Sequence, residues 1–91
     1  MTPEILHDAS RQRFLTIVDG YEGYVQYELA GDVMALTHTI VPAPIGGRGI
    51  AGDLVRHAFD YARAEGLRVA PLCSYAEYWV SRHPEYDDLV S

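Results

Sequence analysis

Residues 36–55, LTHTIVPAPIGGRGIAGDLV, contain the transition that decides the fold of this chain. Residues 33–41 (VMALTHTIV) are rich in β-branched side chains and predict a strand. Residues 42–49 (PAPIGGRG) contain two prolines and three glycines in eight positions, which predicts a loop. Residues 50–65 have apolar side chains at helical spacing and end just before Gly66, so they predict a helix. Its apolar stripe consists of Leu54, Val55, Ala58, Phe59 and Ala62.

The segments on both sides of this stretch predict an α+β fold. Residues 13–18 and 21–29 read as strands, and the short turns that join them to 33–41 predict a three-strand antiparallel meander. Residues 67–72 predict one more strand, which lies parallel to 33–41 because a helix connects the two. The expected architecture is therefore a meander followed by a βαβ unit.

The two ends of the chain have weaker patterns. Residues 1–11 are expected to be a loose lead-in, and residues 74–82 a short helix with Ser74 as its N-cap. The tail that follows is turn-like. Since 91 residues suit one compact core, residues 1–91 are predicted to form a single domain.

Charge and composition exclude several classes of function. The net charge is −6, and the seven basic residues are all arginine, which argues against nucleic-acid binding and excludes Schiff-base chemistry. The single cysteine excludes an internal disulfide, and no histidine pair has the spacing of a metal site. The chain shows neither a signal peptide nor an apolar run that would span a membrane. We therefore expect a cytoplasmic monomer that binds no metal, nucleic acid or membrane.

The glycine loop is the first candidate functional element. Gly46, Gly47 and Gly49 precede a helix whose first N–H groups lack partners and carry partial positive charge. A phosphate could approach this backbone closely, and Arg48 adds a positive charge. The spacing matches neither a Walker A loop nor the dinucleotide fingerprint. Glycines that serve turn geometry alone explain the loop equally well.

Cys73 and His38 are the other two candidates. Cys73 lies where the start of a helix would favour a thiolate, although a lone cysteine is also commonly a buried structural residue. His38 is expected on the same side of its strand as Leu36, with Thr37 and Thr39 on the other side. A histidine on an apolar face is commonly part of a core. The βαβ topology would nevertheless bring the imidazole within reach of the thiol.

Several motifs in the same order resemble the GCN5-related N-acetyltransferases, and in particular their small single-domain, YjdJ-type branch. That branch has L-T-H-T-x-V-P, then a basic-Gly-x-Gly-Ile-Ala loop, then P-x-C-S-Y. The resemblance covers residues 13–88. The matching segments are LTHTIVP (36–42), GRGIA (47–51), PLCSY (71–75) and RHPEY (82–86).

This resemblance implies a trimmed acyl-CoA N-acyltransferase fold and an enzyme that transfers acetyl from its co-substrate acetyl-CoA to an amine. It implies that Cys73 and His38 form the active-site pair, with transfer either direct or through an acetyl-Cys73 intermediate. In the second case His38 would be the base that makes the thiolate, and in the first His38 or Cys73 would deprotonate the incoming amine. The implied CoA-binding residues are Ile40 and Val41 for the pantetheine arm, and Gly46, Gly47, Arg48, Gly49, Ile50 and Ala51 for the pyrophosphate.

A CoA- or acetyl-CoA-binding module with little or no turnover is the alternative, and an interaction domain without CoA binding is a third reading. The family usually has Gln or Arg where this chain has Gly46, which favours a mere binder, whereas His38 and Cys73 favour an enzyme. Full-sized relatives carry N-terminal helices that help to form the acceptor site. We therefore expect a shallow acceptor site or one completed by a partner. The acidic charge suggests a cationic small-molecule or peptide amine as acceptor.

Overall fold

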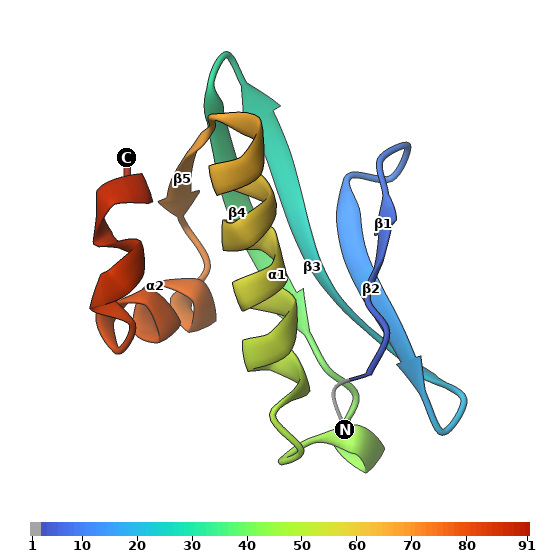
Figure 1. Cartoon of the computed structure of the whole chain (residues 1–91). Coiled ribbons are helices and arrows are strands. Elements are labelled where there is room, and N and C mark those ends of the chain that lie inside the picture. The colour runs from blue at the N-terminus through green and yellow to red at the C-terminus, as the bar shows by residue number, and fades with distance from the viewer. Residues whose placement is uncertain (1–2) are drawn as a thin grey trace.

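Residues 3–91 are described by a computed structural model, in which strands form the first half of the chain and helices most of the second (Figure 1). No helix in this part of the chain is long and apolar enough to cross a membrane. The elements are β1 (Leu6–Asp8), β2 (Arg13–Val18), β3 (Tyr21–Ala30), β4 (Val33–Ile40), η1 (Ala43–Ile45), α1 (Ile50–Glu65), β5 (Arg68–Pro71), α2 (Ser74–Ser81) and η2 (Pro84–Leu89).

The strands form one five-stranded sheet in the order β1-β2-β3-β4-β5. The first three pairings are antiparallel, and β5 is parallel to β4. Since α1 connects β4 to β5, the predicted meander and βαβ unit are both confirmed. The α+β fold class is therefore as the sequence predicted.

The N-terminal segment differs from the prediction of a loose lead-in over residues 1–11. Of these, residues 1–2 lie outside the described part, while Leu6–Asp8 form β1 and extend the sheet beyond β2. The ring of His7 stacks on that of Phe14, with centroids 4.3 Å apart. A three-residue strand has too few positions to show a period. The open edge of β2 decides that this segment pairs.

Helix α1 crosses one face of the sheet, and its apolar stripe forms the centre of the core (Figure 1). Gly66 ends the helix at φ +71°, the left-handed conformation that glycine adopts without strain. Helix α2 contributes to the same core, since Trp79 packs against Phe59 of α1 with ring centroids 5.4 Å apart. The stripe residues Leu54, Val55, Ala58, Phe59 and Ala62 are all fully buried, as predicted.

The opposite face of the sheet has exposed apolar side chains. On β2, Phe14 and Thr16 are buried under α1, so the alternating Ile17 points to the other face, where it is 61% exposed. Ile40 on β4 is 46% exposed. This face is therefore open to solvent at both places.

A β-bulge interrupts the alternation of side chains in β4. Tyr27 of β3 pairs with Leu36, but the preceding residue, Gln26, pairs with His38. Thr37 is therefore the extra residue, opposite no partner in β3. Its hydroxyl donates to the carbonyl oxygen of Gln26 across the irregularity, over 3.3 Å. One inserted residue shifts every later side chain of the strand to the other face.

The bulge reverses two predictions about side-chain direction. Thr39 pairs with Val25, a fully buried core residue, so Thr39 faces α1 just as Leu36 does. His38 points to the open face and is exposed. The expectation that His38 shares a side with Leu36, and that Thr39 faces away from it, is therefore wrong. The prediction assumed that side chains alternate regularly along the whole strand, and the extra residue Thr37 breaks that alternation.

Candidate functional site

Strands β4 and β5 separate halfway along β4. Their pairing runs from Val33 opposite Arg68 to Leu36 opposite Pro71, where β5 ends. The N–H groups of Leu72 and Cys73 then both donate to the carbonyl oxygen of Leu36, over 3.0 and 2.9 Å. Beyond this point, residues 37–40 have no strand beside them on the β5 side. The splayed strand that the resemblance implied is present.

Cys73 lies at this opening and caps α2. Its sulfur accepts a hydrogen bond from the Ala76 N–H at 3.4 Å, so the N-cap is Cys73, not Ser74 as predicted. The backbone cause is the bond from the Cys73 N–H to Leu36, which holds Cys73 in an extended conformation (φ −79°, ψ 147°). The helix therefore starts at the next residue. The thiol is half-buried and packs against the core.

The group that meets the Cys73 sulfur across the opening is Thr39. Its hydroxyl oxygen lies 3.3 Å from Sγ, and either atom can be the donor. His38 instead has Nδ1 3.2 Å from the Thr37 hydroxyl. Among the hydrogen bonds of residues 3–91, none joins His38 to Cys73. The structure thus joins Thr39 and Cys73, and within residues 3–91 the predicted imidazole–thiol pair shares no hydrogen bond.

The N-terminus of α1 presents bare backbone. Gly49 is its N-cap at φ +79° and provides no side-chain hydrogen bond, and the first N–H bonded within the helix is that of Asp53, at 3.1 Å from the Gly49 oxygen. The N–H groups of residues 50–52 thus have no partner from the helix itself. A Cβ at Gly47 or Gly49 would meet nothing within 4 Å. The site offers backbone donors and open space together.

The rest of the loop is held in place from within. Ile45 is fully buried and anchors η1 to the core, and the Gly46 N–H donates to the Ala43 oxygen at 3.0 Å. Arg48 forms an ion pair with Asp19 of the β2–β3 turn, with 2.8 Å between nitrogen and oxygen, and both side chains are exposed. The Gly46 N–H therefore already has a partner within the loop. Arg48 is paired with the Asp19 carboxylate, which a phosphate would have to replace.

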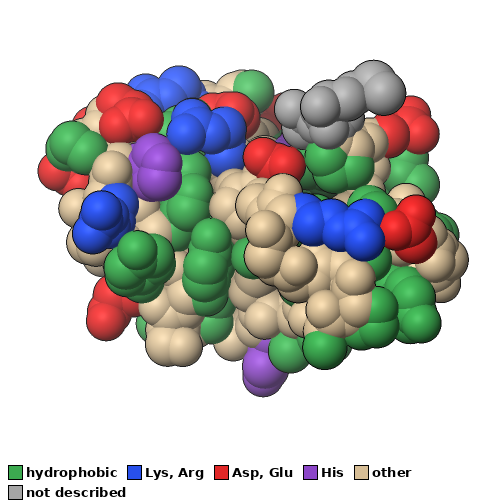
Figure 2. Space-filling view, turned by 90° about the horizontal axis from the view of Figure 1, so that it is seen from below, with side chains coloured by type: hydrophobic (Ala, Val, Ile, Leu, Met, Phe, Trp, Pro, Cys, Tyr) green, Lys and Arg blue, Asp and Glu red, His purple; other side chains and the backbone are tan. Residues whose placement is uncertain are grey.

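This end of the molecule fits a diphosphate group. Figure 2 shows it from below, with backbone and polar atoms over much of its centre and basic side chains beside them. A hollow of about 180 Å³ adjoins the loop, lined by Pro3, Val18, Arg48 and Ile50. Backbone N–H groups and arginine are the donors that phosphates use at helix N-termini, and Gly47 and Gly49 leave room for a phosphate to reach them.

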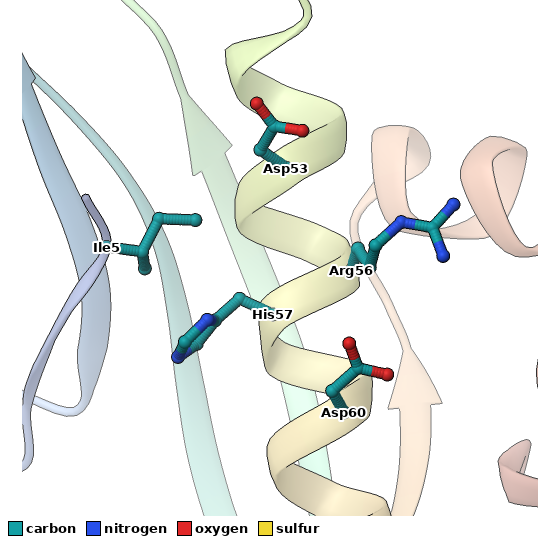
Figure 3. A pocket seen from close by; sticks show the side chains of 5 residues that line it. All are labelled: Ile5, Asp53, Arg56, His57 and Asp60. Carbon is teal, nitrogen blue, oxygen red and sulfur yellow. The ribbon is translucent and has the colours of Figure 1, made fainter. Parts of the chain in front are cut away.

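A second, larger hollow lies elsewhere, along the outer face of α1 (Figure 3). Its volume is about 290 Å³, and no lining side chain comes from β4, β5 or α2. The Asp60 carboxylate already accepts a bond from the Tyr86 hydroxyl at 2.6 Å, and Arg56 donates to that hydroxyl at 3.2 Å. Its lining residues are Ile5, Asp53, Arg56, His57 and Asp60. We assign no ligand to this surface.

The first turns of α1 and α2 lie side by side at Gly52 and Tyr75. A Cβ at Gly52, in the first turn of α1, would lie 3.3 Å from the Tyr75 hydroxyl oxygen and 3.5 Å from Nε1 of Trp79. Burial raises the pKa of the Tyr75 phenol, with smaller contributions from Tyr78 and Asp53. A glycine at position 52 lets α2 approach α1 closely. The sequence offered only a weak indication of this contact, since a glycine can occur inside a helix for many reasons.

These features define an acyl-CoA N-acyltransferase type of fold: a parallel strand pair that splays beside a glycine loop and a helix N-terminus. Residues 13–89 match the family model described as "GCN5-related N-acetyl-transferase". The chain therefore belongs to the GCN5-related N-acetyltransferase family, as its motifs predicted. The family and the fold identify it as an N-acetyltransferase, and the family generally uses acetyl-CoA as co-substrate.

Two relatives and one solved structure are similar to this chain, and the solved structure shares its fold. Protein NATD1 of Bos taurus is 35% identical over 81 residues, covering 86% of this chain and 72% of the relative. Protein NATD1 of Homo sapiens is 33% identical over 81 residues, with the same coverage of both chains. A GCN5-like protein of Staphylococcus aureus, solved by NMR, shares the fold with a TM-score of 0.77 and 21% identity, over 99% of this chain and 89% of that one.

Proposed function

We propose that this chain transfers the acetyl group of acetyl-CoA to an amine, and that Cys73 carries the acetyl group between the two. The observation that supports the cysteine route is the place of the Cys73 sulfur. It lies at the N-terminus of α2 and beside the opening between β4 and β5. A helix N-terminus favours the thiolate, which is the nucleophilic form of cysteine.

The loop and the unpaired edge of β4 are the proposed CoA-binding surface. Backbone N–H groups of residues 47–51 bind the diphosphate, and Arg48 adds charge when it exchanges Asp19 for phosphate. Gly46 does not donate to the diphosphate, because its N–H is already bonded to Ala43; it keeps the loop compact, since a Cβ there would lie 3.3 Å from the Ala43 oxygen. The pantetheine arm lies against β4 at Ile40 and at the adjoining Val41, where no strand covers the edge.

Cys73 performs the first chemical step as a thiolate. Its sulfur attacks the carbonyl carbon of the thioester and forms a new carbon–sulfur bond, while the bond to the CoA sulfur breaks and CoA leaves as a thiolate. The acceptor amine then attacks the acetyl-Cys73 carbonyl carbon. The amide forms as the bond to Cys73 breaks, and the thiolate of Cys73 is restored.

His38 is proposed to take the proton that the amine loses in that second step. Its imidazole is exposed on the open face of the sheet, where an acceptor can approach, and it makes no hydrogen bond to the Cys73 sulfur. His38 is thus proposed as the general base for the amine, and not as the base that deprotonates the Cys73 thiol. The acidic chain favours a cationic amine, either a small molecule or a basic peptide.

Thermal unfolding with acetyl-CoA, CoA and ATP tests the ligand. A ligand at about 100 times its Kd stabilises a fold by about 2.7 kcal/mol, or about ten degrees in Tm for a small domain. We expect this shift with acetyl-CoA and CoA but not with ATP. No shift at millimolar acetyl-CoA would contradict the proposed function and favour an interaction domain.

Mass spectrometry of the chain incubated with acetyl-CoA, without any amine, tests the cysteine route. We expect one acetyl group on the peptide that contains Cys73, and its loss when an amine is added. The matched control is Cys73→Ser, since a serine oxygen also caps a helix but is a poor nucleophile at neutral pH. Binding of CoA with no transfer to Cys73 or to any amine would identify a CoA-binding module instead.

A further inference from the structure

Two threonines on β4 have different partners because of the bulge at Thr37. The hydroxyl of Thr37 is 3.3 Å from a backbone oxygen, that of Gln26. The hydroxyl of Thr39 is 3.3 Å from the sulfur of Cys73, on the other side of the sheet from His38. The two residues have the same side chain and lie two positions apart, but only Thr39 contacts the thiol.

The contact of Thr39 with Cys73 bridges the opening of the sheet. The last β4–β5 pair is Leu36 with Pro71, and both partners of this contact lie beyond it. A sulfur that is a thiolate can only accept, so the hydroxyl of Thr39 then becomes the donor. Together with the Ala76 N–H, two donors converge on the sulfur from different elements, one from β4 and one from α2.

We propose that Thr39 is a positioning residue: its hydroxyl donates to the Cys73 thiolate, stabilises that form and fixes the direction of the sulfur at the opening between β4 and β5. The Ala76 N–H of α2 and the Thr39 hydroxyl of β4 hold the sulfur from two different elements. The role in catalysis rests on the proposed function, whereas the effect on the thiolate does not.

Alkylation of Cys73 by iodoacetamide as a function of pH measures this effect without acetyl-CoA. Cys73 is the single cysteine of the chain, so the reaction reports on one site. Thr39→Val keeps the shape of the side chain and removes the hydroxyl. Loss of a hydrogen bond of ordinary net strength should slow alkylation at neutral pH by about three- to tenfold and move the midpoint of the rate profile to higher pH.

Two further variants distinguish positioning from damage to the fold. Thr39→Ser restores a hydroxyl and should restore the wild-type midpoint. Thr16→Val removes a hydroxyl from β2, where it donates to the Glu4 oxygen and not to the sulfur, so its midpoint should equal that of the wild type. A wild-type midpoint in Thr39→Val would overturn the proposal. An equal shift in Thr16→Val, or no recovery in Thr39→Ser, would also overturn it.

Acetyl-transfer kinetics then connect the thiolate to the reaction. Thr39→Val should lower kcat by about three- to tenfold and leave the KM for acetyl-CoA unchanged, with recovery in Thr39→Ser. If the wild-type chain transfers no acetyl group, the proposed function fails. The alkylation profiles would still decide whether Thr39 stabilises the thiolate.

Discussion

The N-termini of α1 and α2 are capped differently, although both lie beside the opening of the sheet. Helix α1 begins at Gly49 with no side-chain cap and leaves its first N–H groups bare. Helix α2 begins at Cys73, whose sulfur accepts from the Ala76 N–H. One end thus has donors available to an external anion, whereas the other uses a donor to hold a nucleophile. In the proposed function, the orphan N–H groups of α1 bind the diphosphate, and that of Ala76 in α2 holds the Cys73 sulfur.

The largest expected effect comes from removing the nucleophile at α2. Cys73→Ser should lower acetyl transfer by about 100-fold or more, because serine lacks a comparable thiolate at neutral pH. Its oxygen still caps the helix, so the Tm increase caused by CoA should equal that of the wild type. Steady-state kinetics and thermal unfolding measure the two quantities. Wild-type turnover in this variant would show that acetyl passes directly from CoA to the amine.

The next largest effect concerns the bare end of α1. Gly49→Ala places a Cβ at φ +79°, which costs about 1–2 kcal/mol and distorts the donors. We expect CoA affinity, measured by calorimetry, to fall about tenfold.

Gly31→Ala is the matched control for this change. Gly31 has φ +61° and open space around it, like Gly49, but lies in the β3–β4 turn. It should lose similar stability and keep its CoA affinity. Equal loss of affinity in both variants would mean that the α1 loop has no special role.

A smaller effect should follow from releasing Arg48. Asp19→Asn removes the carboxylate that now pairs with Arg48, and asparagine tolerates the positive φ of 52° at this position. We expect CoA to bind about two- to threefold more tightly at low salt. This change in affinity corresponds to the free energy that an exposed ion pair usually contributes. In an Arg48→Gln background the same change should have no effect. Persistence of the gain there would refute the role of Arg48 as a phosphate partner.

The smallest effect concerns the pH dependence of stability, which His7 in β1 should cause. Burial lowers the pKa of His7 below its usual value of 6.5, the nearby His57 lowers it further, and Asp8 opposes both. The folded state therefore binds a proton less readily than the unfolded chain. Stability should fall as the pH drops below about 6.5 and level off once the pH is below the lowered folded pKa.

Urea unfolding of the wild type and of His7→Phe over this pH range measures that effect. The phenylalanine variant keeps a ring that can stack on Phe14 but does not titrate. Its stability should depend less on pH than that of the wild type. An identical pH dependence in both would show that His7 is not the group responsible.

Much of the fold was predictable because its signals are local. The stripe from Leu54 to Ala62 and the terminal Gly66 predicted α1 with the bounds the structure has, Ile50–Glu65. Short turns predicted the meander, and the helix between two strands predicted their parallel pairing. Strand β1 was missed because three residues carry no period of their own.

The places of the candidate residues in the fold were predictable, but the contact that the Cys73 thiol makes was not. The glycine loop, Cys73 and the splay of β4 all lie where the motifs implied. The partner of the thiol, Thr39, was missed. A reader of the sequence would have needed to place the bulge at Thr37, and no residue there is unusual for a regular strand.

The sequence by itself determined which segments are strands and helices, where α1 starts and ends, and that glycines and a cysteine stand at helix N-termini. Those properties depend on neighbours along the chain, within one or two turns. Only the tertiary structure decided that Thr39, and not His38, faces Cys73. That choice depends on the register between β3 and β4, where one residue more or less exchanges the two faces of a strand.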